Sequence, residues 1–536
     1  MKEDDDRGPE LSRPGESDGT ASFHFTDIAR SPCCQTVDDA GPNPPSQKVT
    51  PLEQFRGPSK RRDLHPLEVR LLWFVSAHLV FLPWAFGGMR LWGQIVSLIF
   101  AGVGFAVAMT PRIYARESDA EGPYRISFTG KLLRFPLFWL GLALLVYVAL
   151  QGLNPSWVYQ TDGKVWWMKR LNSISWLPTG VSAPFQHGGG PWRALVIYAS
   201  AWLTMCTIWV GFTRRRSVRI LFIVIATNGV LLSAFGLIQR LLPNGKIFWL
   251  WESSNDSFFS SFIYKNHAAA YLNLCLAVTS GLAAWSYLRG LRRLQKSNPA
   301  GLYVFFALVI AMSVFVSYSR GAAIAMMVFA CLAATGFAIH QWFTPNASRR
   351  PLVIICLAVI LGLFLKIGLE SLDAAEAWSR INHVFSGEDT SVSSRKLATT
   401  ASLDMYGAYW VRGTGAGGFR YLFPTYQSRY PEIYKENGHA VYWEHAHNDI
   451  VEFPIELGLF GVLLVLAAGI WWMQLQLRSS FWKTPLGLLV IMGGGLTVIH
   501  AWGDFLFQCP AILVLWGVLF VAIALWSRFE SRRGSA

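Results

Sequence analysis

The chain has 536 residues, of which 52% are hydrophobic and 15% are charged, and its formal net charge is +14. A soluble domain carries about a quarter charged residues, so the composition predicts a polytopic membrane protein and excludes a disordered protein, a disulfide scaffold and a soluble enzyme. Surplus Lys and Arg also occur in nucleic-acid-binding proteins, but in a membrane protein they are expected in the loops on one side of the membrane.

The first 68 residues are hydrophilic, rich in Pro, Gly, Ser, Asp and Glu, and without apolar periodicity, which predicts a disordered cytoplasmic tail. No short apolar segment with a small-residue cleavage site occurs there, so no cleavable signal peptide is expected. About twelve later stretches are apolar and long enough to cross about 30 Å of hydrocarbon. They begin near Leu71, Leu91, Leu133, Ala194, Ile220, Ala268, Leu302, Ala322, Leu352, Ile450, Leu486 and Phe505.

Basic residues occur in every second loop between these stretches, as in the clusters at residues 60–62, 214–216, 289–293, 349–350 and 528–533. Cytoplasmic loops of membrane proteins carry such an excess of Lys and Arg. The pattern therefore places both termini in the cytoplasm. It accounts for most of the positive charge, and no nucleic-acid partner is expected.

The predicted fold class is an all-α integral membrane protein of about twelve transmembrane helices with a large outward-facing loop before helix ten. Its expected organisation is a tail at 1–68, helices one to nine with outward loops at 69–369, the large loop at 370–449, helices ten to twelve at 450–527 and a cytoplasmic tail at 528–536. Long structured insertions on one face of a membrane protein are usually its working parts.

The large loop mixes Tyr and Trp with five arginines, which are Arg380, Arg395, Arg412, Arg420 and Arg429. Aromatic rings beside guanidinium groups suit a sugar face and a phosphate together. The alternative is a solvated cap whose aromatic residues lie at the membrane interface.

The most informative motif is His445-Ala446-His447-Asn448-Asp449, where the large loop re-enters the membrane. Asp449 and Glu452 have the spacing of a capping box, so a helix is expected to begin here. His447 would then lie just outside a helix N-terminus, where backbone N–H groups and the helix dipole favour an anion such as phosphate. The alternative is a histidine that only caps the helix.

His445 and His447 also form a His-x-His pair, which can chelate a metal if the backbone is extended. A third ligand, such as Glu444, His439 or Glu436, would be needed, and these residues have no characteristic metal-ligand spacing. No bound metal is therefore expected.

Two further motifs place a cation at the outer ends of the predicted helices. Arg320 follows Ser317-Tyr318-Ser319, and an Arg at membrane depth costs several kcal/mol unless it is paired or lines a wet cavity. Lys265-Asn266-His267 stands at the outer entrance of the sixth predicted helix. A functional site explains both motifs, and the alternatives are a snorkelling arginine and an interfacial anchor.

The large loop contains two other motifs. Arg395 lies in Ser391-Val392-Ser393-Ser394-Arg395-Lys396. Four glycines within Gly413–Gly418 precede Arg420, and glycine permits a ligand to approach the backbone closely.

Phosphate-cradling Gly-rich loops and kinase or dinucleotide-binding fingerprints are absent from the sequence, so ATP-driven work is not expected. Any chemistry on the outward face would use a substrate that arrives already activated. No cofactor is expected.

Taken together, these motifs resemble the O-antigen ligase and polymerase superfamily. The resemblance rests on Phe262–His267, Ser319-Arg320-Gly321, Ser393-Ser394-Arg395, the Gly413–Gly417 turn with Phe419-Arg420-Tyr421, and His447-Asn448 with Gly458 and Gly461. It covers about residues 190–525, and the helix pattern with one large outward loop is also similar to that of the ligases. The acidic, Pro-rich N-terminal tail has no counterpart in this resemblance.

The resemblance implies a metal-independent, GT-C-like glycosyltransferase on the outer face of the bacterial inner membrane. Its donor would be a glycan on undecaprenyl pyrophosphate, and its acceptor a glycolipid of the lipid A-core type or another glycan. By the same resemblance, His447, Arg320 and Arg395 match catalytic residues, and we expect Lys265, His267, Arg420, Asn448 and His445 to bind substrate. Fixed guanidinium groups would stabilise the departing pyrophosphate, and a neutral imidazole would take the proton of the acceptor hydroxyl.

Three other activities remain open on the sequence. A polymerase of lipid-linked repeat units and a protein O-oligosaccharyltransferase would share the donor and the membrane architecture. A flippase for lipid-linked sugars would instead be expected to show inverted repeats and ionisable residues near the middle of the membrane. The charged residues named above gather at the outward ends.

Overall fold

The computed structural model describes residues 64–114, 124–253, 255, 257–294, 297–343, 362, 366, 390–436, 439–440, 442–479 and 481–534. All of them belong to one compact unit, Asp63–Ala536. Residues 1–63 of the predicted tail lie outside the described residues, and so does nearly all of the predicted helix that begins near Leu352.

Nine of the described helices are long and apolar enough to cross a membrane. They are α1 (Pro66–Trp84), α2 (Leu91–Met109), α4 (Pro136–Leu153), α5 (Pro191–Gly211), α6 (Arg215–Leu241), α7 (Lys265–Arg292), α9 (Arg320–Phe343), α15 (Asp449–Ser479) and α17 (Pro510–Gly534). Two shorter apolar helices are α8 (Ala300–Val316) and α16 (Pro485–His500). Each begins near a predicted start, which confirms the helical membrane architecture, while the total of about twelve stays a prediction.

Proline marks the first position of five of these helices, namely Pro66, Pro136, Pro191, Pro485 and Pro510. The first N–H groups of a helix have no partner within it, so proline loses nothing there, and its fixed φ favours the first turn. These prolines therefore fix where the chain turns into the bundle.

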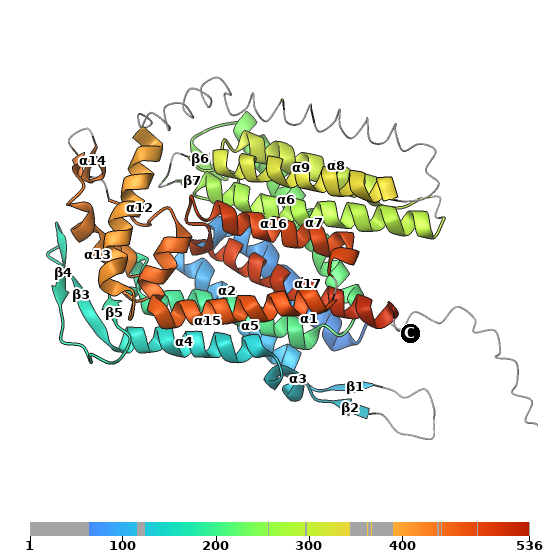
Figure 1. Ribbon diagram of the computed structural model, residues 1–536, viewed down its shortest axis with the longest axis horizontal. Helices are drawn as coiled ribbons and strands as arrows, with labels where there is room; N and C mark the ends of the chain where they lie inside the picture. Colours follow the sequence, from blue (N-terminus) through green and yellow to red (C-terminus); the bar gives the residue numbers. More distant parts are fainter. Residues whose placement is uncertain are drawn as a thin grey trace, which may run out of the picture. The chain divides into compact units, whose positions relative to one another are not determined.

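Burial divides the helices into a centre and a periphery (Figure 1). In α17 and α7, 89% and 72% of the most apolar window is buried inside the protein, whereas the corresponding share is 22% in α4 and 28% in α9 and α15. Other helices thus surround the central helices, and the peripheral ones leave apolar side chains for lipid.

A buried ion pair fastens one end of the bundle. Arg112 donates from Nη1 to Glu68 Oε2 at 3.1 Å, and both side chains are at most 1% exposed. Arg112 also donates to the carbonyl of Gly211 at 2.7 Å, and Ser217 donates to Glu68. The pair joins α1, α5, α6 and β1 (Arg112–Tyr114), whose partner is β2 (Tyr124–Ile126).

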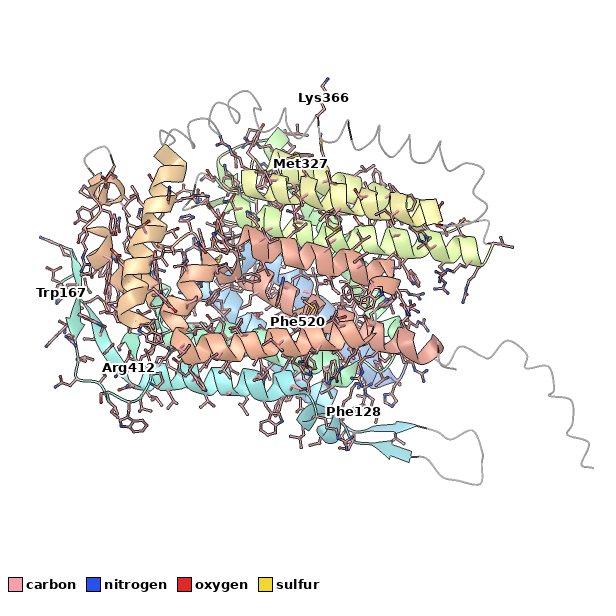
Figure 2. All side chains as sticks on the ribbon, viewed as in Figure 1. Phe128, Trp167, Met327, Lys366, Arg412 and Phe520 are labelled. Atoms are coloured by element: carbon pink, nitrogen blue, oxygen red, sulfur yellow. The ribbon has the colours of Figure 1, made fainter. Side chains whose placement is uncertain are left out.

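The opposite end of the bundle carries the segments outside the long helices. Figure 2 labels Trp167 at this end and Phe128 at the end where the ion pair lies. Between α4 and α5 the chain forms a three-stranded sheet in the order β4-β3-β5, with β3 antiparallel to β4 and parallel to β5. Its strands are β3 (Pro155–Thr161), β4 (Trp166–Arg170) and β5 (Gly180–Ser182). The all-α prediction did not include this sheet, whose strands are too short to stand out by periodicity beside long apolar helices.

Further short elements lie at this end. They are the turn η1 (Phe86–Gly88), β6 (Lys246–Ile247), β7 (Trp251–Glu252), α12 (Thr390–Tyr409), α13 (Phe419–Gln427), α14 (Pro431–Tyr434), β8 (Lys435–Glu436), β9 (His439–Ala440) and the turn η4 (Leu506–Gln508). The described part of the large loop, from residue 390, is thus mainly helical. Its apolar core includes Met405, Phe419 and Phe423 and packs against Trp157 and Tyr159 of the sheet.

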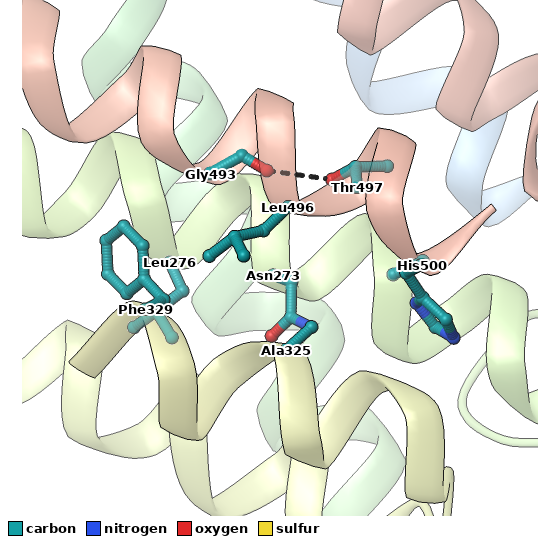
Figure 3. Close-up of a pocket in the computed structure, with 9 residues that line it drawn as sticks. Asn273, Leu276, Ala325, Phe329, Gly493, Leu496, Thr497 and His500 are labelled. Carbon is teal, nitrogen blue, oxygen red and sulfur yellow. Dashed lines mark hydrogen bonds between the residues drawn. The ribbon is translucent and has the colours of Figure 1, made fainter. Parts of the chain in front are cut away.

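A small cavity lies where α7, α9 and α16 meet (Figure 3). Its volume is about 10 Å³, and Asn273, Thr497 and His500 contribute its polar lining. The side-chain amide of Asn273 donates to the carbonyl of Ala322 at 2.9 Å. A space of this size holds about one water molecule, so it serves helix packing and cannot hold a substrate.

Candidate active site

The N-terminus of α15 builds one wall of the site. Asn448 caps the helix, because its Oδ1 accepts from the N–H of Ile450 at 3.1 Å. The sequence correctly predicted a helix start here but assigned the cap to Asp449. Asp449 is instead the first helical residue, and its carboxylate accepts from the N–H of Phe507 at 2.7 Å. This contact holds the turn that precedes α17 against the start of α15.

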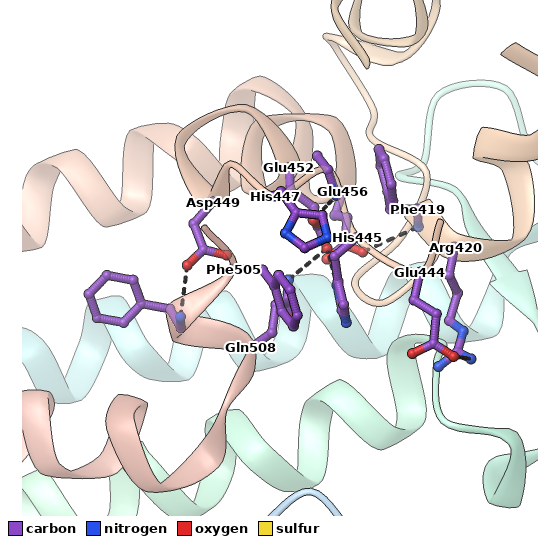
Figure 4. A network of polar contacts seen from close by, with 12 residues as sticks. Phe419, Arg420, Glu444, His445, His447, Asp449, Glu452, Glu456, Phe505 and Gln508 are labelled. Atoms are coloured by element: carbon purple, nitrogen blue, oxygen red, sulfur yellow. Dashed lines mark hydrogen bonds and ion pairs between the residues drawn. The ribbon is translucent and has the colours of Figure 1, made fainter. Parts of the chain in front are cut away.

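Glu452 fixes the segment that carries the two histidines (Figure 4). Its side chain is fully buried; Oε1 accepts from His445 Nδ1 at 2.7 Å and from Gln508 at 3.0 Å, while Oε2 accepts from the N–H of Ala446 at 2.7 Å. A buried carboxylate with several donors is a rigid anchor. His445, which we expected to bind substrate, therefore has one ring nitrogen committed to positioning.

Phe505 forms an aromatic centre between the segments. The ring of His445 stacks on it at 4.5 Å, and the ring of Tyr264 stacks on it at 5.2 Å. The rings of His447 and His267 meet it edge to face at 4.8 Å and 4.9 Å. His267 is 1% exposed and lies 3.0 Å from the carbonyl of Phe505, so it supports this ring from within the bundle.

His447 is held in an unusual backbone conformation. Its φ is +50°, in the left-handed region that non-glycine residues seldom adopt. Its Nδ1 lies 3.6 Å from Oδ1 of Asp504, and 24% of its side chain is exposed. One side of the imidazole thus faces a buried carboxylate, while the ring remains accessible.

Asp504 carries a negative charge beneath the histidines. Burial alone would raise its pKa, but hydrogen bonding and the charge of His447, together with His267 and His500, lower the pKa to about 2. The amide of Asn266 donates to its Oδ2, and the N–H of Phe505 donates to Oδ1 at 2.9 Å. The carboxylate is therefore ionised at neutral pH.

Cations gather beside this carboxylate. Lys265, at the start of α7, lies within electrostatic range of Arg240, Arg320 and Arg395. Arg395 on α12 donates to the carbonyl of Gly503 at 3.3 Å, directly before Asp504. Across the described ranges, neither Lys265 nor Arg320 has a carboxylate at ion-pair distance. Such a group of cations suits a multiply charged anion.

Arg420 points to a neighbouring region instead (Figure 4). Its guanidinium donates to Glu444 Oε1 at 2.7 Å and to the carbonyl of Gly188 at 3.2 Å. Burial would lower its pKa, but the negative charge of Glu444 and the hydroxyl of Tyr442 raise it above the ordinary value. In the structure Arg420 thus joins α13 to the loop before α5, and its contact with substrate stays a prediction.

The glycine turn at Gly413–Gly418 packs against protein backbone, whereas the sequence suggested approach by a ligand. A Cβ on Gly415 would meet the Cα of Gly180 at 2.5 Å, and one on Gly417 would meet the nitrogen of Gly190 at 2.6 Å. The N–H of Gly415 donates to the carbonyl of Glu456 at 3.0 Å. These glycines fasten the large loop onto α15 and the sheet.

No cluster of three or more His, Cys, Asp and Glu side chains is arranged as metal ligands within the described portion of the chain. His445 and His447 face different carboxylates, Glu452 and Asp504. The expected metal independence remains a prediction.

The structure brings together His447, His445, His267, Asn448, Lys265 and Arg395 from three separate segments. Sequence reasoning did not find Asp504, Phe505 or Glu452 as parts of the site. Asp504 and Phe505 belong to no recognisable motif. The one available signal was that Asp504 is an acidic residue at the outer end of an apolar segment.

Comparison with known proteins identifies the segment that carries most of this site. No curated protein matches the chain. Residues 304–466, which contain Arg320, Arg395 and His447, match the sequence model of a protein family described as O-antigen ligase. This match confirms, over these residues, the resemblance to the O-antigen ligase superfamily drawn from the motifs, and the long apolar helices agree with a multi-pass membrane protein.

Proposed function

We propose that the protein transfers a glycan from undecaprenyl pyrophosphate to an acceptor hydroxyl, most simply one of a lipid A-core type glycolipid, at the outer face of the bacterial inner membrane. The observation that carries this proposal is the accessible His447 ring backed by Asp504, with Arg395 bonded to the carbonyl just before Asp504 and within electrostatic range of Lys265, which also lies in range of Arg320. A base and an anion site at one end of a membrane bundle match what this transfer needs.

The base in this proposal is the Nε2 atom of His447. A proton on Nδ1 is stabilised by the Asp504 carboxylate 3.6 Å away, which leaves Nε2 as the acceptor. The acceptor oxygen forms a bond to the anomeric carbon of the donor sugar, and its proton passes to Nε2. Asp504 acts through His447 and is a positioning residue.

The leaving group is undecaprenyl pyrophosphate. As the bond between the anomeric carbon and the phosphate oxygen breaks, the electron pair stays on the pyrophosphate. Arg320, Arg395 and Lys265 stabilise this charge, and an Arg can bind phosphate oxygens in a bidentate manner. The polyprenyl chain would lie along the lipid-facing helices.

The test is a transfer assay with purified protein, a lipid-linked glycan donor and three separate acceptors: lipid A-core, a second lipid-linked glycan and a Ser/Thr-containing peptide. We expect product on lipid A-core. Product on the second lipid-linked glycan alone would indicate a polymerase, and product on the peptide alone would indicate an O-oligosaccharyltransferase. Movement of labelled donor across proteoliposomes without any transfer would overturn the proposal in favour of a flippase.

A further inference from the structure

A second cavity opens at the same end of the bundle, between the η1 turn and the hairpin of β6 and β7. Its volume is about 510 Å³, within the range of small-molecule sites. Phe86, Trp92, Trp251 and Ile263 give it an apolar lining, and Arg90 and Glu252 add charged groups. None of these residues belongs to the candidate active site.

The aromatic rings of this cavity pack edge to face. The rings of Trp92 and Trp251 each stand at 90° to the ring of Phe86, with centroids 6.4 Å and 5.8 Å away. Phe248 supports both Phe86 and Trp251 from behind at 5.9 Å and 5.7 Å. Trp92 is 50% exposed and Trp251 is 53% exposed, so both indoles keep surface free for a ligand.

The backbone around this cavity is held in an uncommon conformation. Phe86, Phe248 and Trp249 have φ values of 57°, 55° and 60°, which bulky residues rarely adopt. Hydrogen bonds retain the hairpin in this form, from the N–H of Trp249 to Lys246 and from Trp249 Nε1 to the carbonyl of Leu242 at 2.6 Å. Of these three residues, Phe86 lines the cavity and Phe248 packs against two of the lining rings, so this conformation shapes the cavity.

The polar groups lie at the opening. Arg90 is exposed, and the Glu252 carboxylate is bridged to Lys246 at 3.3 Å while 85% of its side chain remains exposed. Aromatic faces bind the C–H faces of a sugar ring, and charged side chains accept from and donate to its hydroxyls.

The cavity is joined to the active site by direct contacts. Gly87, beside Phe86, accepts at its carbonyl from Cys509 Sγ at 3.3 Å, and a Cβ on Gly87 would meet the ring of Phe262 at 2.7 Å. Cys509 ends the η4 turn that follows Phe505, and Ile263 of the cavity precedes Tyr264 and Lys265. Both sites therefore share the same two supporting segments.

We propose that this cavity is an oligosaccharide-binding subsite, which holds sugar residues of the glycan that are not the reacting one. The inference rests on the proposed glycan transfer for its role in catalysis, while binding itself does not depend on that activity. The sugar residues belong either to the donor glycan or to the acceptor glycan, which share this chemistry.

The kinetic test compares Trp251→Leu with Trp251→Phe, since leucine keeps an apolar contact for lipid but lacks an aromatic face. Donors carry either one sugar or a full oligosaccharide on polyprenyl pyrophosphate, and acceptors are lipid A with either a single core sugar or a complete core. For Trp251→Leu we expect KM to rise about tenfold for the long form of one substrate and far less for its short form. Trp251→Phe should retain most of the affinity. Trp176→Leu, an indole that is 79% exposed on another loop, is the matched control and should behave as wild type.

The substrate whose long form is affected identifies the source of the glycan. Equal effects on long and short forms, or equal effects of Leu and Phe, would overturn the subsite and leave an interfacial anchor. Saturation-transfer NMR with the free oligosaccharides separates this inference from the proposed function. Binding that Trp251→Leu abolishes in a protein without transfer activity would support the subsite and contradict the transferase. Transfer with no saturation of either oligosaccharide would do the reverse.

Discussion

At the residue scale, the chemistry depends on how His447 is oriented. Its backbone is left-handed, and contacts with Phe505 and with Trp443 at 5.3 Å hold the ring edge to face. Because Nδ1 faces Asp504 at 3.6 Å and neighbouring rings restrict rotation, the remaining nitrogen is presented in one direction.

Replacing His447, Arg320 or Arg395 by Ala should reduce glycan transfer by at least about 100-fold, since each removes a base or a charge that acts in the transition state. Membrane abundance should be unchanged. Arg429→Ala is the control, because this loop arginine contacts only Tyr426, at 5.0 Å, among the contacts described for it. Full transfer by His447→Ala in the purified assay would remove His447 from catalysis.

Asp504 should make stability depend on pH in a defined range. Its pKa is about 2 in the folded protein against an ordinary 3.8, so the fold favours the ionised form. This contribution is complete above about pH 4 and is lost as the pH falls towards 2. The melting-temperature difference between wild type and Asp504→Asn should therefore be large at pH 6 and shrink at pH 3. Glu432→Gln, at an exposed carboxylate, should show no such change, and a difference that grows on acidification would contradict the assignment.

Within the candidate site, the residues with a proposed reacting role were found from the sequence, whereas the residues that support them were not. His447 and the arginines stand in motifs whose chemistry is local, so residue type and position beside a predicted helix were enough. Asp504, Phe505 and Glu452 act through contacts between segments up to about two hundred and forty residues apart, such as that of Asn266 with Asp504, and no local pattern records such contacts.

At the scale of elements, α15 is interrupted where it meets the large loop. Gly458 has φ 63° and ψ −173°, a conformation open almost only to glycine. The break frees carbonyls that the helix would otherwise use. Thr414 donates to Ile455 at 2.9 Å, Gln151 to Glu456 at 3.0 Å, and the hydroxyl of Tyr147 to Leu457 at 2.6 Å.

Gly458→Ala should destabilise the protein strongly. Its Cβ would fall 2.6 Å from the Gly413 nitrogen and the Val411 carbonyl, and the backbone conformation alone costs about 1–3 kcal/mol. We expect a melting temperature several degrees lower in detergent, with reduced transfer. Gly469→Ala is the matched control in the same helix, because nothing lies within 4 Å of its added Cβ. A loss of the same size in both variants would show that the break is not the cause.

Elements were predictable to the extent that hydropathy defines them. Apolar stretches located the long helices within a few residues, because only a helix satisfies its backbone in lipid. The strands Pro155–Thr161 and Trp166–Arg170 were missed, since a half-buried sheet outside the membrane has no such requirement. The glycine turn was recognised as a close approach, but its partner was protein backbone.

At the scale of the whole molecule, the two ends of the bundle differ in chemistry. One end has the buried pair Glu68–Arg112 and Arg215, whose guanidinium lies 3.9 Å from the ring centroid of Trp526. The other has the active-site cations, the sheet and the aromatic cavity. The basic loops predict that the first end is cytoplasmic. The sequence alone supports this prediction, because the distribution of Lys and Arg among the loops sets the orientation when the chain is inserted into the membrane.

Cysteine labelling tests this orientation. In a variant without the native cysteines, Trp176→Cys between β4 and β5 should react with a membrane-impermeant maleimide in intact spheroplasts. Arg134→Cys, directly after α3 (Thr129–Leu133), should react only after permeabilisation. Both side chains are exposed, so access to the reagent depends on sidedness. The reverse pattern would place the active site on the cytoplasmic face.

The interrupted helix also limits which segments can be exchanged with a related protein in a chimaera. The turn at Gly413–Gly418 bonds to the first part of α15 through backbone atoms, and Tyr147 and Gln151 of α4 donate to backbone carbonyls of α15, so matching the side chains of a transplanted loop would not by itself restore the fit. A chimaera that exchanges the large loop alone would separate these partners. A chimaera that changes acceptor or donor preference and remains active should therefore require α4, the sheet, the large loop and α15 to be exchanged together.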